Sequence, residues 1–332
     1  MRLFRHRANG AGPAHYASAA ELPYPCWVEP TADAALSELI DTSTKRAWPA
    51  LRKVLARYRA DDLTALIENL CRERMAELDG WLPVALTRER EDPLARTVLG
   101  AHGIAKAWDL RTAKFAQQGS QEWMRTLYDG LRSAEQFLMD AAAIDPGDSA
   151  PRYFLLQSGH SLVWDLTELT HLFKLVVDRT PDHIGAHDQI LQSLCEKWYG
   201  SHEAMFDFAR AAMRGPYAEK LASLVAQAHI EQWAYRGRDE EAYREIRTDE
   251  SRAELSQAAE LTLFRSGQHD PRRPYKDANL YAAVFSLAEM WPEAWRAFEA
   301  ADGVIDNSWV LVDRQNPYSA YVDARAKAFE HF

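Results

Sequence analysis

Three prolines in the middle of the chain recur at a constant interval. Pro146, Pro181 and Pro216 stand 35 residues apart, from 146 to 181 and from 181 to 216. Proline lacks an amide proton and forces the residue before it out of the α region, so it marks helix ends reliably. An interval of this length is close to that of a helix-turn-helix repeat unit. The spacing therefore predicts a stack of α-helical hairpins.

Three helical segments carry a small, a large and a small apolar residue at the same spacing. The positions are Ala134, Leu138 and Ala141, then Ala204, Phe208 and Ala211, and finally Ala294, Phe298 and Ala301. The first two sets precede Pro146 and Pro216 at identical offsets, and Asp306 stands where the third set would have its proline. Small and large side chains alternating on one face predict close packing between neighbouring helices.

The set Ala204, Phe208, Ala211 with Pro216 resembles the second helix of the tetratricopeptide repeat, which places alanine, an aromatic residue, alanine and proline at these offsets. The resemblance is to a divergent member, because the unit ending at Pro181 has Leu169, Phe173 and Val176 instead. It covers residues 120–301. It implies an all-α, tetratricopeptide-like helical-hairpin solenoid that binds a protein or peptide on its concave face.

A second resemblance lies in the segment Lys197-Trp198-Tyr199-Gly200-Ser201-His202. This segment is similar to one in a family of uncharacterised bacterial repeat proteins, and the similarity implies no particular activity. It marks the junction of two repeat units around Trp198 and His229. Within it, the Gly-Ser pair predicts a helix end followed by a new helix with Ser201 as its N-cap.

Punctuation by glycine and proline divides the chain into four parts. We predict an N-terminal arm over residues 1–30, helical hairpins over 31–119, tetratricopeptide-like repeats over 120–265, and a C-terminal repeat with a capping helix over 266–332. The apolar content of the second half of the arm, which includes Leu22, Tyr24 and Trp27, indicates that it docks on the body of the protein.

Composition and charge exclude several classes. A hydrophobic content of 47% predicts a folded globular protein. With 39 basic against 49 acidic residues, the net charge of −10 opposes binding to nucleic acid. Three widely spaced cysteines fit a reducing compartment, and no long apolar stretch predicts a signal or a membrane span. We expect a cytoplasmic protein that does not bind membranes; its oligomeric state stays open.

Extending the repeat register along the chain predicts a concave binding face. Its candidate ligand-binding residues are Phe154, Ser158, Gln189, Ser193, Glu196, Trp198 and Glu231. The usual nucleotide-binding, hydrolase and zinc-protease motifs do not occur, so we expect no cofactor. A protein- or peptide-binding module is the leading hypothesis for function.

The alternative hypothesis is a metal-binding protein or an enzyme. Six of the 11 histidines fall between residues 160 and 229. The candidate catalytic residues would be His187, His202, His229 and Glu231, with Trp198 walling the pocket. Pairs at helical spacing, such as His183 with His187, can chelate a metal, but isolated pairs are more often packing residues, and we predict no metal site from them. Convergence of three such side chains in the structure would favour this alternative.

Overall fold

The structure is a computed structural model, and it describes most of the chain. Placement is described for residues 18–19, 22–27, 34–86, 88–89, 91–113, 121–161, 165–198, 200–265 and 275–332, with side chains left out at 110–113, 121–124 and 160–161. Within these ranges the protein is all-α, apart from two strands of two residues each. The predicted fold class is confirmed at this level.

Six helices build the N-terminal lobe. They are α1 (Ala34–Ser43), α2 (Trp48–Leu55), α3 (Ala60–Glu73), α4 (Met75–Asp79), α5 (Leu82–Leu86) and α6 (Pro93–Ala113). Asp92 begins α6 as predicted, since its carboxylate accepts a hydrogen bond from the Leu94 amide at 3.2 Å. The same carboxylate receives the indole N–H of Trp48 and the guanidinium of Arg52, which ties α2 to the start of α6.

Five helices form the middle of the molecule. They are α7 (Gln121–Ile144), α8 (Ala150–Ser161), α9 (Leu166–Val177), α10 (Ile184–Leu194) and α11 (His202–Arg214). Each packs against the next in chain order, and α8 also contacts both α6 and α10. Helices α7, α9 and α11 end two to four residues before Pro146, Pro181 and Pro216, which confirms the predicted boundaries.

The remaining helices form the C-terminal lobe. They are α12 (Ala218–Leu221), α13 (Ser223–Tyr235), α14 (Glu240–Ile246), α15 (Asp249–Leu261), α16 (Lys276–Leu287), α17 (Trp291–Ala301), α18 (Trp309–Val312) and α19 (Pro317–His331). The segments 217–235 and 239–265 are each divided into two helices. Thr248 explains the second division, because its hydroxyl caps α15 by accepting the Ser251 amide.

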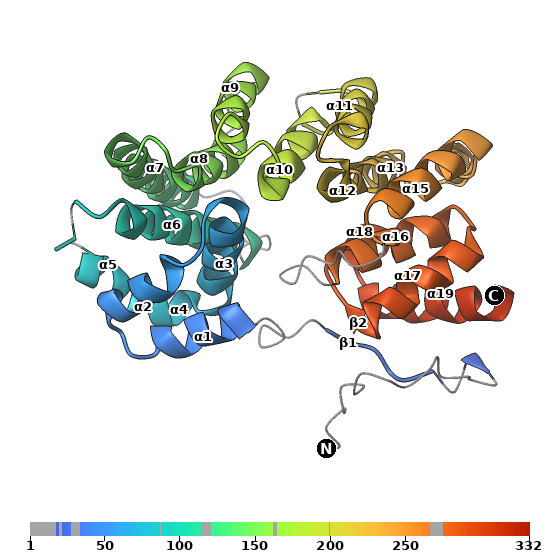
Figure 1. The fold of residues 1–332 in the computed structure, drawn as a ribbon, viewed down its shortest axis with the longest axis horizontal. Helices are drawn as coiled ribbons and strands as arrows, with labels where there is room; N and C mark the ends of the chain where they lie inside the picture. The colour runs from blue at the N-terminus through green and yellow to red at the C-terminus, as the bar shows by residue number, and fades with distance from the viewer. Residues whose placement is uncertain are drawn as a thin grey trace.

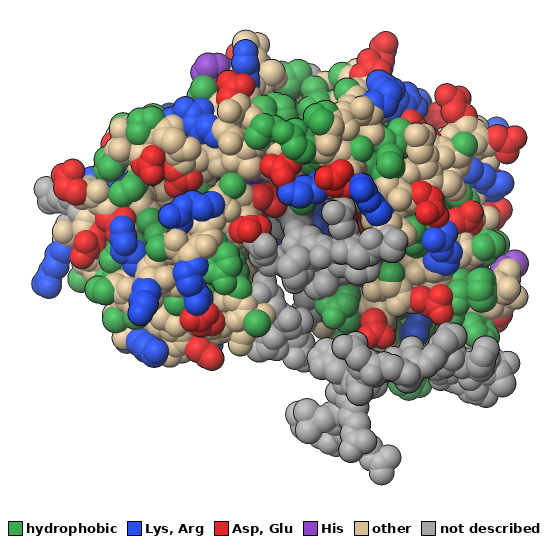
Figure 2. Space-filling model, in the orientation of Figure 1, with side chains coloured by type: hydrophobic (Ala, Val, Ile, Leu, Met, Phe, Trp, Pro, Cys, Tyr) green, Lys and Arg blue, Asp and Glu red, His purple; other side chains and the backbone are tan. Residues whose placement is uncertain are grey.

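The helices follow an arch. The N-terminal lobe and the C-terminal lobe stand side by side, and α7 to α11 run across the top from one to the other (Figure 1). The space-filling view shows the surface hollowed between the two lobes, with acidic and basic side chains together along the upper edge of the hollow (Figure 2). We call the surface of the arch that borders this space the inner face.

Two clusters of buried apolar residues stabilise the two halves, and they meet on α10. The N-terminal cluster ends at Ile190, and the C-terminal cluster begins at Leu191. Phe208 of α11 packs against both. Because buried apolar area is the main favourable term in folding, this seam is where the halves are held together.

The three small-large-small sets have different outcomes. The set on α7 and the set on α17 are buried, as predicted. On α11 the prediction is wrong, since Ala204 and Phe208 are only partly buried and Ala211 is exposed. That helix instead buries Met205, Phe206, Ala209 and Met213. Its apolar face is rotated because Phe206 packs against the ring of His229 on α13.

A parallel strand pair, which the helical pattern of the sequence did not predict, joins the arm to the C-terminal lobe. Strand β1 (Cys26–Trp27) pairs with β2 (Val304–Ile305), with Cys26 opposite Val304. Leu22 packs against the C-terminal cluster, so the predicted docking of the second half of the arm is observed. The boundaries predicted at residues 30, 119 and 265 adjoin segments outside the described residues.

Candidate functional site

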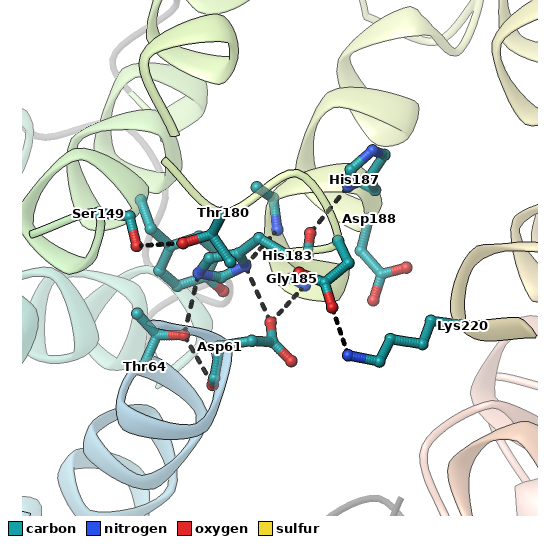
Figure 3. A network of polar contacts seen from close by, with 12 residues as sticks. Asp61, Thr64, Ser149, Thr180, His183, Gly185, His187, Asp188 and Lys220 are labelled. Carbon is teal, nitrogen blue, oxygen red and sulfur yellow. Dashed lines mark hydrogen bonds and ion pairs between the residues drawn. The ribbon is translucent and has the colours of Figure 1, made fainter. Parts of the chain in front are cut away.

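Helix α10 is the joint of the arch, and a buried polar network fixes its N-terminal end. His183, which stands at the N-cap position of the helix, is fully buried and lies with Nδ1 2.9 Å from Oδ1 of Asp61 on α3. The same carboxylate oxygen accepts the Gly185 amide at 2.9 Å, and Thr64 lies 3.4 Å from Nε2 of the imidazole (Figure 3). These contacts lock α10 onto the N-terminal lobe.

The proton on the His183 ring follows from its neighbours. Nδ1 lies 2.9 Å from Asp61 and 3.2 Å from the Ala186 amide, and one nitrogen cannot donate to the first and accept from the second. We assign the proton to Nδ1, because a carboxylate facing an imidazole lone pair would be repelled. His183 therefore donates to Asp61, and the residue serves as a link between α3 and α10.

Aromatic packing closes the network on its other side. The ring of Tyr153 on α8 stacks on His183 with centroids 4.8 Å apart, and its hydroxyl donates to Glu68 at 2.7 Å. A Cβ atom at Gly185 would lie 3.0 Å from this ring, so the absence of a side chain permits the close approach. The joint is thus packed from α3, α8 and α10 together.

His187 lies one turn further along α10 and faces a different environment. Its Nδ1 donates to the carbonyl of His183 at 2.9 Å, and its ring packs against Phe173 and Phe208. Burial lowers the pKa of the imidazole, and the bond to the His183 carbonyl opposes that shift only in part. His187 is therefore a neutral packing residue at pH 7. Its ring and that of His183 face different neighbours, so the two do not form one binding site.

Two ion pairs connect the start of α10 with the C-terminal lobe. Lys220 of α12 pairs with Asp182, and Lys276 of α16 pairs with Asp188. Figure 3 shows Lys220 reaching across from the neighbouring helix toward the start of α10, with Asp188 on the same side. All four side chains are partly exposed. They place charges of both signs between α10 and the helices α12 and α16.

His202 begins α11, and Ser201 caps this helix as predicted by accepting the Ala204 amide at 3.1 Å. The imidazole Nε2 lies 3.2 Å from Glu196, yet neither ring nitrogen makes a well-aligned hydrogen bond with a described residue. Burial lowers the pKa of His202, while Glu196 acts in the opposite direction. Its ring packs edge-on against Tyr235 at 5.4 Å.

His229 belongs to a polar cluster that joins three helices. Its Nε2 donates to Glu254 of α15 at 3.0 Å, and Arg210 of α11 makes two hydrogen bonds to the same carboxylate at 2.6 and 3.2 Å. Burial alone would raise the pKa of Glu254, but the bonds from His229 and Arg210 outweigh it and lower that pKa to about 2. His229 was predicted from the sequence, but its partners were not. Arg210 and Glu254 lie 19 and 25 residues from His229 and follow no motif.

Glu231 is buried two residues beyond His229 on α13 and has its own partners. Its carboxylate accepts hydrogen bonds from Gln192 and Lys197, each at 2.6 Å, and from Gln227 at 3.2 Å. With these donors its charge is compensated inside the interface between α10 and α13. Its position is that of a structural ion pair.

The four residues of the catalytic alternative therefore do not share one site. His187 faces aromatic rings, His202 faces Glu196, His229 faces Glu254, and Glu231 faces Lys197. Among the residues that the structure describes, no three His, Cys, Asp or Glu side chains lie close enough to hold a metal ion. The convergence that would favour the metal or enzyme hypothesis is not observed in this part of the chain.

The predicted ligand-binding residues fall into two groups. Phe154, Ser158, Ser193 and Glu231 are buried between helices, with Ser158 donating to Glu135 and Ser193 to the Gln189 carbonyl. These side chains are not presented to a partner in this structure. Gln189, Glu196 and Trp198 keep exposed surface. The register extended from Pro216 placed the first group on the surface because it did not allow for the rotation of individual helices.

Comparisons with known proteins add no assignment. No helix in the described ranges has the length and hydropathy that a crossing of the bilayer requires. Neither the models of known protein families nor the curated protein sequences include a match to this chain.

Proposed function

We propose that this protein is a tetratricopeptide-like interaction module that binds an extended segment of another protein on the inner face of the arch. The helical-hairpin packing supports the repeat assignment, since each helix from α6 to α11 contacts the next one and α8 contacts the helices two places before and after it. Stacked hairpins of this kind generate extended concave surfaces. The proposal concerns the hollow between the lobes (Figure 2).

Two partly exposed ion pairs, which we assign to the inner face, carry the proposal. The lysine side chains of Lys220 and Lys276 are 49% and 36% exposed, and Asp182 and Asp188 are each 27% exposed. Exposed ion pairs contribute little to stability, commonly less than about 1 kcal/mol. Their groups can therefore exchange an internal partner for one on a bound chain at small cost.

The chemistry of these groups indicates the kind of partner. Two cations and two carboxylates alternate within one region, so the surface offers both donors and acceptors. A polyanion such as nucleic acid would be repelled by the carboxylates and by the net charge of −10. A peptide backbone with mixed side chains matches both kinds of group.

The test selects peptides from a random library on the full-length protein and measures their affinities by fluorescence anisotropy. We expect the double variant Lys220→Ala, Lys276→Ala to bind the selected peptides about tenfold more weakly, which corresponds to about 1.4 kcal/mol. Lys174→Ala on the exposed face of α9 is the matched control and should leave affinity unchanged. Equal affinities for the double variant and the wild type would refute the inner-face site.

A further inference from the structure

The arm docks on the C-terminal lobe in the manner of a bound extended peptide. The Cys26 amide donates to the Gly303 carbonyl at 2.9 Å, and β1 continues in parallel register beside β2. Arg325 of α19 donates to the Pro23 carbonyl at 2.8 Å, and Leu22 packs against the C-terminal cluster. Main-chain hydrogen bonds to a strand edge, with one apolar anchor, are the features of peptide recognition by strand addition.

The described residues 22–27 of the arm add little to the core. Tyr24 is 83% exposed and Trp27 is 42% exposed, so the Tyr24 ring lies largely in solvent and the Trp27 ring lies partly in solvent. Pro23 and Pro25 have no amide protons and hold the backbone extended, which lowers the entropy lost on docking. The segment thus has the composition of a preorganised ligand rather than that of a central strand.

Beneath the arm, two buried polar atoms have no hydrogen-bond partner among the described residues. They are the hydroxyl of Tyr321, whose side chain is fully buried, and Nε of Arg325. Burial raises the pKa of Tyr321 to about 12, and the charges of Arg325, Cys26 and Asp302 shift it to a smaller extent. An unsatisfied buried polar group costs about 1–3 kcal/mol. Residues 22–27 therefore occupy the site without forming a hydrogen bond to either of these atoms.

We propose that the edge of β2 and the facing side of α19 form a second binding site, which takes an extended leucine- and proline-containing segment of a partner protein. Residues 22–27 occupy this site in cis as a self-ligand, and the partner segment replaces them. This site is separate from the inner face.

When residues 22–27 occupy this site, they also connect the C-terminal lobe to the N-terminal lobe. β1 ends at Trp27 on the C-terminal lobe, and α1 begins at Ala34 in the N-terminal lobe. The intervening stretch can span at most about 25 Å when fully extended. Replacement of the arm by a partner would remove this tie at the open end of the arch (Figure 1).

The experiment uses the full chain with the arm weakened. In Leu22→Asp the apolar anchor is lost, so the arm leaves the site. A fluorescent peptide with the sequence of residues 20–29, carrying serine for cysteine at its position 26, is then titrated and followed by anisotropy. We expect saturable binding to Leu22→Asp and at least tenfold weaker binding to the wild type, whose own arm competes at high effective concentration.

Controls separate the site from non-specific binding. Adding Arg325→Gln to Leu22→Asp should weaken binding, because Arg325 donates to the Pro23 carbonyl, whereas adding Arg296→Gln, on α17 of the same lobe, should not. If Leu22→Asp loses helix content by circular dichroism, Leu22→Ala should give the same order of affinities. The absence of saturable binding up to 1 mM peptide, or equal binding with Arg325→Gln, would overturn the proposal. Lys220→Ala, Lys276→Ala should bind the arm peptide normally, so the two proposed sites can fail independently.

Discussion

Glu254 is the residue whose replacement should most clearly reveal the polar cluster between α11, α13 and α15. We consider Glu254→Gln, which keeps the shape of the side chain and removes its charge. The carboxylate is 12% exposed and receives three hydrogen bonds from Arg210 and His229. Its loss leaves a partly buried guanidinium and a buried imidazole with a neutral partner, which is costly in a region of low dielectric.

The magnitude follows from the pKa of the carboxyl. In the folded protein the pKa is lowered from 4.5 to about 2, and a difference of this size corresponds to about 3 kcal/mol of stability. Because the folded-state pKa is the lower one, this stabilisation is fully present above about pH 4.5. It is lost as the pH falls toward 2, at about 1.4 kcal/mol per pH unit.

The assay is urea unfolding of the wild type and Glu254→Gln between pH 3.5 and 8. We expect the difference in unfolding free energy to be constant near 3 kcal/mol above pH 5 and to narrow below pH 4.5. Glu260→Gln is the control, since Glu260 is 58% exposed, pairs with Arg296 at 2.9 Å, and should contribute less than about 1 kcal/mol. A difference that does not change with pH would refute the argument from the pKa.

Three further predictions concern packing, a buried acid and the thiols. A Cβ atom at Gly200 would lie 2.7 Å from Cα of Leu194, so Gly200→Ala should lower the unfolding free energy by more than about 2 kcal/mol, and an unchanged thermal midpoint would contradict this. Burial raises the pKa of Asp306 to about 6, so the free energy of unfolding falls as the pH rises from 3.8 through 6. Asp306→Asn should therefore stabilise the protein by about 1–2 kcal/mol at pH 8 and not at pH 3.5. Equal effects of the substitution at both pH values would count against this explanation. The exposed Cys26 thiol should react with Ellman's reagent in the native protein. Burial raises the pKa of the Cys71 and Cys195 thiols to about 12, so these two should react only after unfolding. Rapid reaction of all three thiols in the native protein would be inconsistent with the structure.

Local signals in the sequence predicted helix boundaries well. The prolines at 146, 181 and 216 and the cap at Ser201 act through residues within one turn of themselves, so their effect does not depend on the rest of the fold. The face that a helix buries depends on its neighbours, and here the sequence was less informative. On α11 the pattern favoured Ala204 and Ala211, whereas contact with α13 selected Met205 and Phe206 instead.

The candidate sites were harder to predict because their residues are distant in sequence. Asp61 and His183 are separated by more than 100 residues, and neither belongs to a motif that would suggest a pair. The same holds for Arg325 and Pro23, which join the two ends of the chain. A concentration of histidines between 160 and 229 suggested one site, but adjacent helices direct these side chains into separate interfaces.

The halves of the arch are connected in two different ways, and the difference bears on how the proposed sites would act. At the top, α10 runs continuously from one apolar cluster to the other and is fixed by His183 and Asp61, so bending there would break buried contacts. At the open end, the described residues 22–27 of the arm are held by a two-residue strand pair, one anchor and a few hydrogen bonds, which is a much weaker attachment than that of α10. Local opening occurs where few buried contacts must be broken. A partner segment that displaces the arm would therefore loosen the open end first and leave the joint at α10 intact, so that the inner face would become more accessible without unfolding of either lobe.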